Sequence, residues 1–140
     1  AILHLKLAEA QNFNKKRKKV AKYYYKHLKF LNNSLLPEKY LPLSSWHLFP
    51  LKLRNNGVRK RLQSHLTELG IGCASYYEKS MSQEKALVKF IGEKEEAEKF
   101  AGRVLCLPMN PFITEEEIRF VSDKIKDFFD LTIEADVLTN

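Results

Sequence analysis

The chain has 140 residues, of which 44% are hydrophobic and 29% are charged, a composition typical of one globular domain rather than a disordered segment. Its formal charge of +7 favours anionic partners but does not choose between nucleic acid, phosphate-bearing metabolites and acidic surfaces. No apolar run approaches the roughly 20 residues that span a bilayer, and no signal-peptide pattern opens the chain, so we expect a cytoplasmic protein without membrane contact. The two cysteines and four histidines show no metal-ligand spacing, so no metal site is predicted.

Residues 1–31 predict one long helix. Apolar residues recur every three or four positions from Leu3 through Leu7 to Leu31 and form a single stripe. No residue before Ala1 supplies an N-cap. A helix that starts uncapped and apolar indicates a chain cut from a larger protein, and we expect this helix to link the domain to a preceding one.

A basic run, NKKRKK at residues 14–19, lies inside this helix. Such a run can form a nucleic-acid patch, so a basic-helix module that binds an anionic partner such as nucleic acid is the alternative function. A solvated helix face is the simpler interpretation, because the side chains spread around more than one face and no aromatic residues are interleaved for base stacking. Of the tyrosines that follow, we expect Tyr24 in the core and Tyr23 and Tyr25 partly exposed.

A connector with two prolines spans residues 32–45, and a strand is predicted at residues 46–53. Its alternation places Phe49, Leu51 and Leu53 on one face, and Pro50 confines the strand to a sheet edge or a bulge. The next segment is an amphipathic helix with its apolar stripe at Val58, Leu62, Leu66 and Leu69, and Gly70 ends it.

The segment 73–82 is expected to form a second strand and a loop, and residues 93–104 another helix. A short buried run then leads through Pro108 and Pro111 to a capping box, in which Thr114 and Glu117 satisfy each other's backbone donors. The last helix is expected to end near Phe129, and residues 130–140 are interpreted as a tail.

Three separated motifs resemble one family. The stretch LPMNPFITEEEI at residues 107–118 resembles the closing segment of the DegT-type nucleotide-sugar aminotransferases, which are pyridoxal-phosphate (PLP) enzymes of the aspartate-aminotransferase fold. The helix pattern between Asn14 and Leu28 and the stretch SWHLFPL at residues 45–51 are similar to earlier segments of the same family. The resemblance implies an α/β fold in residues 1–129: a small, mostly antiparallel sheet packed against helices and preceded by one long helix.

The resemblance also implies which residues face the substrate. The family typically has His-Tyr-Pro-x-Pro-x-His where this chain has Tyr76 to Ser82, so Tyr76 replaces the first histidine and Ser82 the second. A phenol can still donate a hydrogen bond to a phosphate or a sugar hydroxyl. The candidate substrate-binding residues are Tyr76, Tyr77, Ser82, Trp46 and His47, and an ordinary surface loop is the competing interpretation of 76–82.

The catalytic lysine is expected outside this sequence. A PLP transaminase needs a Schiff-base lysine and a carboxylate for the pyridine nitrogen, and no lysine here lies in a sequence resembling the family's Schiff-base motif. The implied parent enzyme would aminate a keto sugar of a nucleotide-sugar, with glutamate as the expected donor, for polysaccharide or glycan biosynthesis. The resemblance further implies a homodimer and no nucleic-acid partner, whereas this chain alone is predicted to be inactive.

Overall fold

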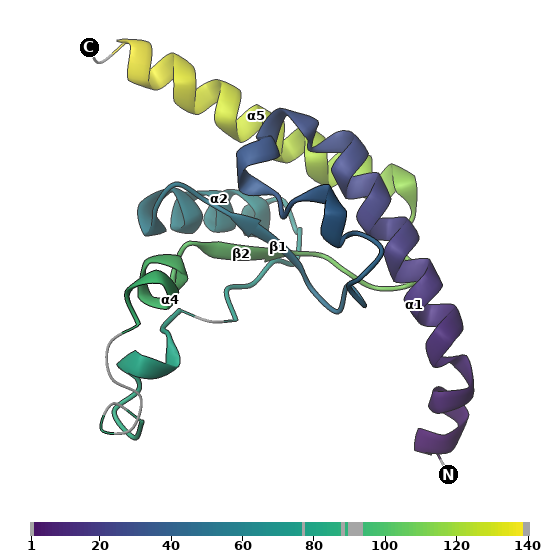
Figure 1. Cartoon of the computed structure of the whole chain (residues 1–140). Coiled ribbons are helices and arrows are strands. Elements are labelled where there is room, and N and C mark those ends of the chain that lie inside the picture. Colours follow the sequence, from purple (N-terminus) through teal and green to yellow (C-terminus); the bar gives the residue numbers. More distant parts are fainter. Residues whose placement is uncertain (1, 77, 88, 90–93, 139–140) are drawn as a thin grey trace.

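A two-stranded antiparallel sheet packed against helices forms the centre of the computed structural model (Figure 1). The structure describes residues 2–76, 78–87, 89 and 94–138, and side chains between residues 6 and 131 within those ranges. The elements in chain order are α1 (Ile2–His27), β1 (Phe49–Lys52), α2 (Asn56–Glu68), α4 (Glu95–Phe100), β2 (Val104–Leu107) and α5 (Glu115–Leu138). The expected fold class is confirmed: a small antiparallel sheet packs against helices and is preceded in the chain by one long helix.

The two strands divide their side chains between a core face and an outer face. Phe49 pairs with Leu107 and Leu51 with Leu105, and all four are buried, as strand alternation requires. Pro50 lies on the outer face, opposite Cys106. The backbone N–H and carbonyl of Cys106 bond to Ala74, so no hydrogen bond between β1 and β2 needs the donor that proline lacks.

The strand expected in segment 73–82 is reduced to a single bridge. The Cys106 N–H donates to the Ala74 carbonyl at 2.8 Å and the Ala74 N–H donates back at 3.1 Å, and no further pairing of this segment is present among the described residues. The helix expected at 93–104 is likewise shorter, because α4 ends at Phe100 and Val104 already belongs to β2.

Helices α1, α2 and α5 cover the core face of the sheet, while α4 lies beyond one end of the strands, next to the start of β2 (Figure 1). Aromatic rings join α1 to β1: Tyr24 stacks on Phe49 with ring centroids 4.5 Å apart, and Trp46 stacks on Phe49 at 5.5 Å. The Tyr24 hydroxyl donates to the Pro108 carbonyl at 2.8 Å. Burial raises the Tyr24 pKa far above its usual value, with Glu117 adding to the effect, so this hydroxyl stays a donor.

Only the C-terminal part of the apolar stripe of α1 is buried. Val20, Tyr24 and Leu28 are buried, whereas Leu7 is 69% exposed, because the N-terminal part of α1 projects past the rest of the domain (Figure 1). The expectation for Tyr25 was wrong: its ring is buried and its hydroxyl donates to Leu36 O at 2.6 Å. The chain after α1 folds back over this ring, and periodicity along one helix cannot reveal that.

Helix α2 has the start and stop that its sequence predicts. The Asn55 side chain accepts a hydrogen bond from Val58 N at 2.9 Å, which is an N-cap. Gly70 adopts φ +74, and the Ile71 N–H reaches Leu66 O at 2.9 Å, the bond of a Schellman C-cap. Leu69, the last residue of the predicted apolar stripe, is exposed because it falls at this cap.

Helix α5 begins at the predicted capping box. Glu117 accepts from Thr114 N at 2.7 Å, and the Thr114 hydroxyl accepts from Glu117 N at 3.2 Å. The predicted stripe then packs as expected, since Ile118 and Ile125 are fully buried. The helix continues to Leu138, well past the expected end near Phe129, so most of the segment interpreted as a tail is helical.

Replacing Thr114 by alanine should lower the free energy of unfolding by about 1 kcal/mol, the usual cost of a lost N-cap. Urea unfolding of Thr114→Ala and of Thr114→Ser measures this change. Serine keeps the capping hydroxyl and should recover most of the loss. An alanine variant as stable as the parent chain would show that this hydroxyl does not cap α5.

The contact between Thr114 and Glu117 also makes the stability loss in Thr114→Ala depend on pH. The Thr114 backbone N–H, and then its hydroxyl, hold the pKa of Glu117 below its usual value of 4.5. A carboxyl whose folded pKa is lowered stabilises the fold above its unfolded pKa, and this contribution is lost as the pH falls through the folded pKa. The stability difference between the parent chain and Thr114→Ala should therefore narrow below about pH 4.5.

Candidate functional site

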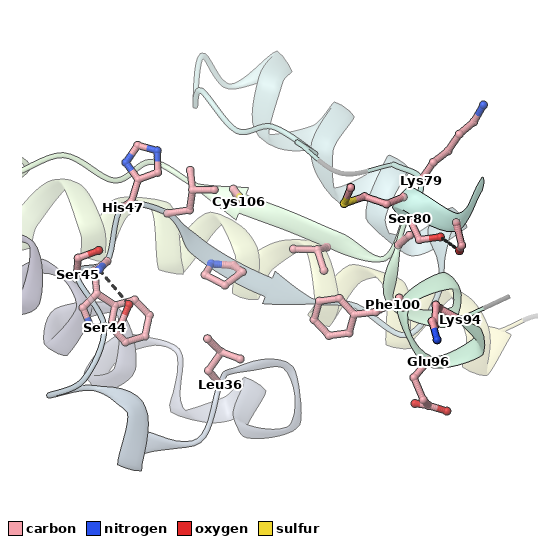
Figure 2. A pocket seen from close by; sticks show the side chains of 18 residues that line it. Leu36, Ser44, Ser45, His47, Lys79, Ser80, Lys94, Glu96, Phe100 and Cys106 are labelled. Carbon is pink, nitrogen blue, oxygen red and sulfur yellow. Dashed lines mark hydrogen bonds between the residues drawn. The ribbon is translucent and has the colours of Figure 1, made fainter. Parts of the chain in front are cut away.

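A groove of about 960 Å³ lies over the outer face of the sheet (Figure 2). Its floor is formed by the outward residues Leu48, Pro50, Val104 and Cys106, the alternate set to those in the core. Burial raises the pKa of the Cys106 thiol, so the floor is uncharged and mostly apolar. We call this cavity the outer groove.

The near wall of the outer groove is formed by Leu36 and residues 44–47. Trp46 adopts φ +51, an uncommon conformation for a non-glycine residue, and its backbone N–H donates to the Ser44 hydroxyl at 3.0 Å. This turn separates two predicted site residues. The Trp46 ring is 1% exposed and its indole N–H donates to Leu41 O at 2.9 Å, while His47 is exposed at one end of the groove (Figure 2).

The far wall consists of residues 78–83 and 94–102, which face each other across a polar contact. The Ser82 hydroxyl is buried and donates to Glu98 at 2.5 Å, and it also pairs with the Ser80 hydroxyl at 2.7 Å. Ser82, predicted to bind substrate, therefore already holds the two parts of the far wall together. Phe100 projects into the groove from α4 (Figure 2).

Tyr76 borders a second, smaller cleft of about 220 Å³ that shares Leu48 and Cys106 with the outer groove. It lies in a bend beyond the Ala74 bridge and is 61% exposed. The structure thus brings Tyr76 near Leu48 and Cys106, two floor residues of the groove that His47 lines. Tyr77 falls outside the described residues.

Charged groups are confined to the ends of the outer groove. Lys79, Lys94 and Glu96 lie at the end opposite His47 (Figure 2). In the described part of the chain, no group of three or more acidic, histidine or cysteine side chains could hold a metal ion. Among the same residues, no helix has the length and apolar character needed to cross a membrane.

The basic run on α1 lies away from this groove, and its side chains go to separate places. Lys18 donates to Pro42 O at 2.7 Å. The ammonium of Lys16 lies over the Phe112 ring and that of Lys19 over the Tyr23 ring, 5.0 and 5.7 Å from the ring centroids. These lysines pack on neighbouring surface instead of forming one stripe.

Sequence reasoning missed the α4 side of the groove. Ala97, Phe100 and Ala101 were placed on one side of a predicted helix with no role in a site, whereas they line the outer groove. The useful signal was the three acids in the first turn of α4, which are typical of a surface helix rather than of a core element.

Comparison with known proteins identifies the family. The model of the DegT/DnrJ/EryC1/StrS aminotransferase family matches residues 1–126. The erythromycin biosynthesis sensory transduction protein EryC1 of Saccharopolyspora erythraea is 32% identical over 130 residues, which are 90% of this chain and 35% of that protein. A dTDP-3-amino-3,6-dideoxy-alpha-D-galactopyranose transaminase of Aneurinibacillus thermoaerophilus is 26% identical over 131 residues, 91% of this chain and 35% of that protein.

Comparison with solved structures identifies the same family. A DegT/DnrJ/EryC1/StrS aminotransferase from Brucella abortus superposes with a TM-score of 0.76 at 27% identity, covering 90% of this chain and 34% of that one. NtdA of Bacillus subtilis, solved with the cofactor PMP bound, gives a TM-score of 0.64 at 31% identity, covering 81% and 28%. The chain spans about 35% of the length of the curated relatives it matches. It belongs to the DegT/DnrJ/EryC1/StrS aminotransferase family.

Proposed function

We propose that this chain is the substrate-closing part of a PLP-dependent transaminase that aminates a keto sugar carried on a nucleotide, with glutamate as the amino donor. The family match over residues 1–126 supports the reaction class. The name of the Aneurinibacillus transaminase supports a nucleotide-linked sugar as the substrate class. A cytoplasmic homodimer, acting in polysaccharide or glycan biosynthesis, is the assembly and setting in which we expect the parent enzyme to work.

The outer groove carries this proposal. A small-molecule site typically has a volume of roughly 300–1,000 Å³, a mostly apolar lining and a few polar groups that fix orientation, and the groove has this form with about 960 Å³. We assign substrate hydrogen bonds to His47 at one end and to the Tyr76 hydroxyl beside the floor. Trp46 supports the turn that presents His47, and Ser82 holds the far wall.

The lining does not fit PLP itself. A PLP site needs a lysine for the aldehyde and several donors for the phosphate, whereas the floor of the groove offers carbon and a protonated thiol. Lys79 and Lys94 are exposed at the far end. We therefore infer that the parent enzyme holds PLP and its Schiff-base lysine mainly outside this sequence, and we route no chemical step through these residues.

Tyr76→Phe tests the proposal in the full-length parent enzyme. The change removes only a hydroxyl, and it should weaken nucleotide-sugar binding by about 0.5–1.5 kcal/mol for a neutral hydrogen bond, or more if the acceptor is a phosphate. The half-reaction with glutamate should stay nearly unchanged, because that smaller substrate does not need this hydroxyl. Steady-state KM for the sugar and single-turnover rates with glutamate measure the two effects.

Tyr40→Phe is the matched control, since Tyr40 is also an exposed tyrosine and borders neither the groove nor the Tyr76 cleft. It should leave both measurements as they are. Equal sugar KM in Tyr76→Phe and the parent enzyme would make the Tyr76 loop an ordinary surface loop and remove Tyr76 from the site.

A further inference from the structure

Arg59 is a buried charge on the surface helix α2. The residue is 2% exposed, which is rare for arginine unless its guanidinium is paired. Its Nε donates to Gly102 O at 3.2 Å, Nη1 donates to Gln63 at 2.6 Å, and Nη2 donates to Asn56 at 2.8 Å. Nη2 also lies 3.3 Å from the Glu78 carboxylate, which supplies the opposite charge.

These contacts join three segments that are distant in sequence. Arg59 belongs to α2, Gly102 to the turn between α4 and β2, and Glu78 to the segment after the Ala74 bridge. The backbones of the Gly102 and Glu78 segments also lie close together here. Gly102 adopts φ +72, and a Cβ added to it would lie 3.4 Å from the Glu78 carbonyl oxygen. One guanidinium therefore anchors both parts of the far wall of the outer groove at their junction.

The far wall is held by contacts outside the hydrophobic core. The core of the described chain is built from α1, α2, α5, the strands and their flanking loops, and no residue of the far wall belongs to it. Residues 94–102 are tied to the region of β1 by the Arg103 side chain, which donates to Lys99 O and to Leu53 O, and by the Lys52 ammonium, 5.8 Å from the centroid of the Phe100 ring.

Residues 78–83 are tied by polar contacts: Glu78 to Arg59, and Ser82 to Glu98 of the other part of the wall. Phe100 and Met81, which project from this wall, line the groove.

We propose that Arg59 is a positioning residue that sets the far wall of the outer groove through its contacts with Glu78 and Gly102, and thereby controls how the sugar substrate fits. The second half of this statement rests on the proposed function. Arg59 itself does not border the groove, so its effect passes through the wall and not through contact with the substrate.

Hydrogen exchange on the 140-residue chain tests the structural half. In Arg59→Met and in the milder Glu78→Gln, amides of the wall such as Gln83 and Ala101, which donate to Ser80 O and Ala97 O, should exchange roughly tenfold faster, the scale of one lost hydrogen bond to a charged group. The amides of Leu51 and Leu105, which lie opposite each other in the β1–β2 pair, should change little. Arg61→Met is the control, because Arg61 is exposed on the same helix and should leave wall and sheet unchanged.

The assignment of Arg59 as a positioning residue would be overturned by either of two results: hydrogen exchange that becomes equally faster at wall and sheet amides, or exchange that becomes no faster in either variant. If Arg59→Met does not fold, Glu78→Gln decides, since Glu78 is exposed and its loss leaves the neutral contacts of Arg59 intact.

The parent enzyme tests the functional half. Glu78→Gln should raise the KM for the nucleotide-sugar severalfold and leave the glutamate half-reaction unchanged, whereas a general loss of stability would lower both. Arg59→Lys, which keeps the charge but not the fork of donors, should restore the exchange pattern and the KM only in part. Faster wall exchange with an unchanged sugar KM would keep Arg59 as the anchor of the wall and reject the outer groove as the sugar site.

Discussion

Trp46→Ala should lower the free energy of unfolding by about 3–5 kcal/mol, the range for truncating a large buried aromatic residue. The ring packs against Phe49 and Tyr25, with centroids 5.5 and 5.9 Å away. Its indole N–H holds the Leu41 carbonyl, which would lose its partner as well. The positive φ of Trp46 is tolerated because these contacts fix the turn, so the near wall of the outer groove depends on this one side chain.

His47→Ala is the matched control, because the next residue in the chain is exposed and borders the groove. Its effect on stability should stay within roughly 0.5 kcal/mol, while the sugar KM of the parent enzyme should rise. Chemical unfolding of the two variants separates the roles. A Trp46→Ala variant as stable as His47→Ala would place the indole outside the core and contradict the packing described above.

Ala97→Trp should block the outer groove. Ala97 is an exposed residue of α4 that lines the groove, so an indole there occupies space that we assign to the substrate at little cost to the core. Overfilling a well-shaped site costs on the order of 1–3 kcal/mol, so the sugar KM of the parent enzyme should rise roughly tenfold or more. The measurement is KM for the nucleotide-sugar, with the rate of the glutamate half-reaction as the internal reference.

Glu95→Trp provides the control for bulk. Glu95 lies on the same helix, does not line the groove and pairs with Lys99 at the surface, where an ion pair contributes little to stability. Its sugar KM should stay near that of the parent enzyme. Equal KM values for Ala97→Trp and Glu95→Trp would show that the substrate does not enter the outer groove.

Features that depend on residues close together in the sequence could be predicted from it. The capping box from Thr114 to Glu117 needs only a spacing of three, and it is present with both reciprocal bonds. The alternation of the predicted strand put Phe49 and Leu51 on one face and Pro50 on the other, and the first of these faces is the buried one. Gly70 marked the end of α2 because only a residue without a Cβ adopts its conformation easily.

Features that depend on partners far away in the chain could not be predicted from the sequence. Leu7 continues the stripe of α1, but it is exposed because no element of the described chain packs against it, and periodicity alone could not show this. Arg59 sits on a helix rich in charges, and its burial follows from Glu78 and Gly102, which are far away in the chain.

The site was predicted in part for the same reason. His47 and Tyr76 were singled out by the family resemblance; His47 borders the outer groove and Tyr76 borders the neighbouring cleft. Ser82, chosen on the same ground, has its hydroxyl occupied by Glu98. A match of motif identifies a position, but whether a side chain there is available depends on partners elsewhere in the fold.

Amino-group transfer by the full-length parent enzyme tests the central claim most directly. With PLP and glutamate, it should convert a keto nucleotide-sugar from a panel of such compounds into the amino sugar, with one glutamate converted to 2-oxoglutarate for each sugar aminated. Mass spectrometry of the sugar and an assay of 2-oxoglutarate follow the two sides of this exchange. An enzyme loaded with PLP that aminates no member of the panel would contradict the claim, and submicromolar binding of nucleic acid by α1 would then favour the basic-helix alternative.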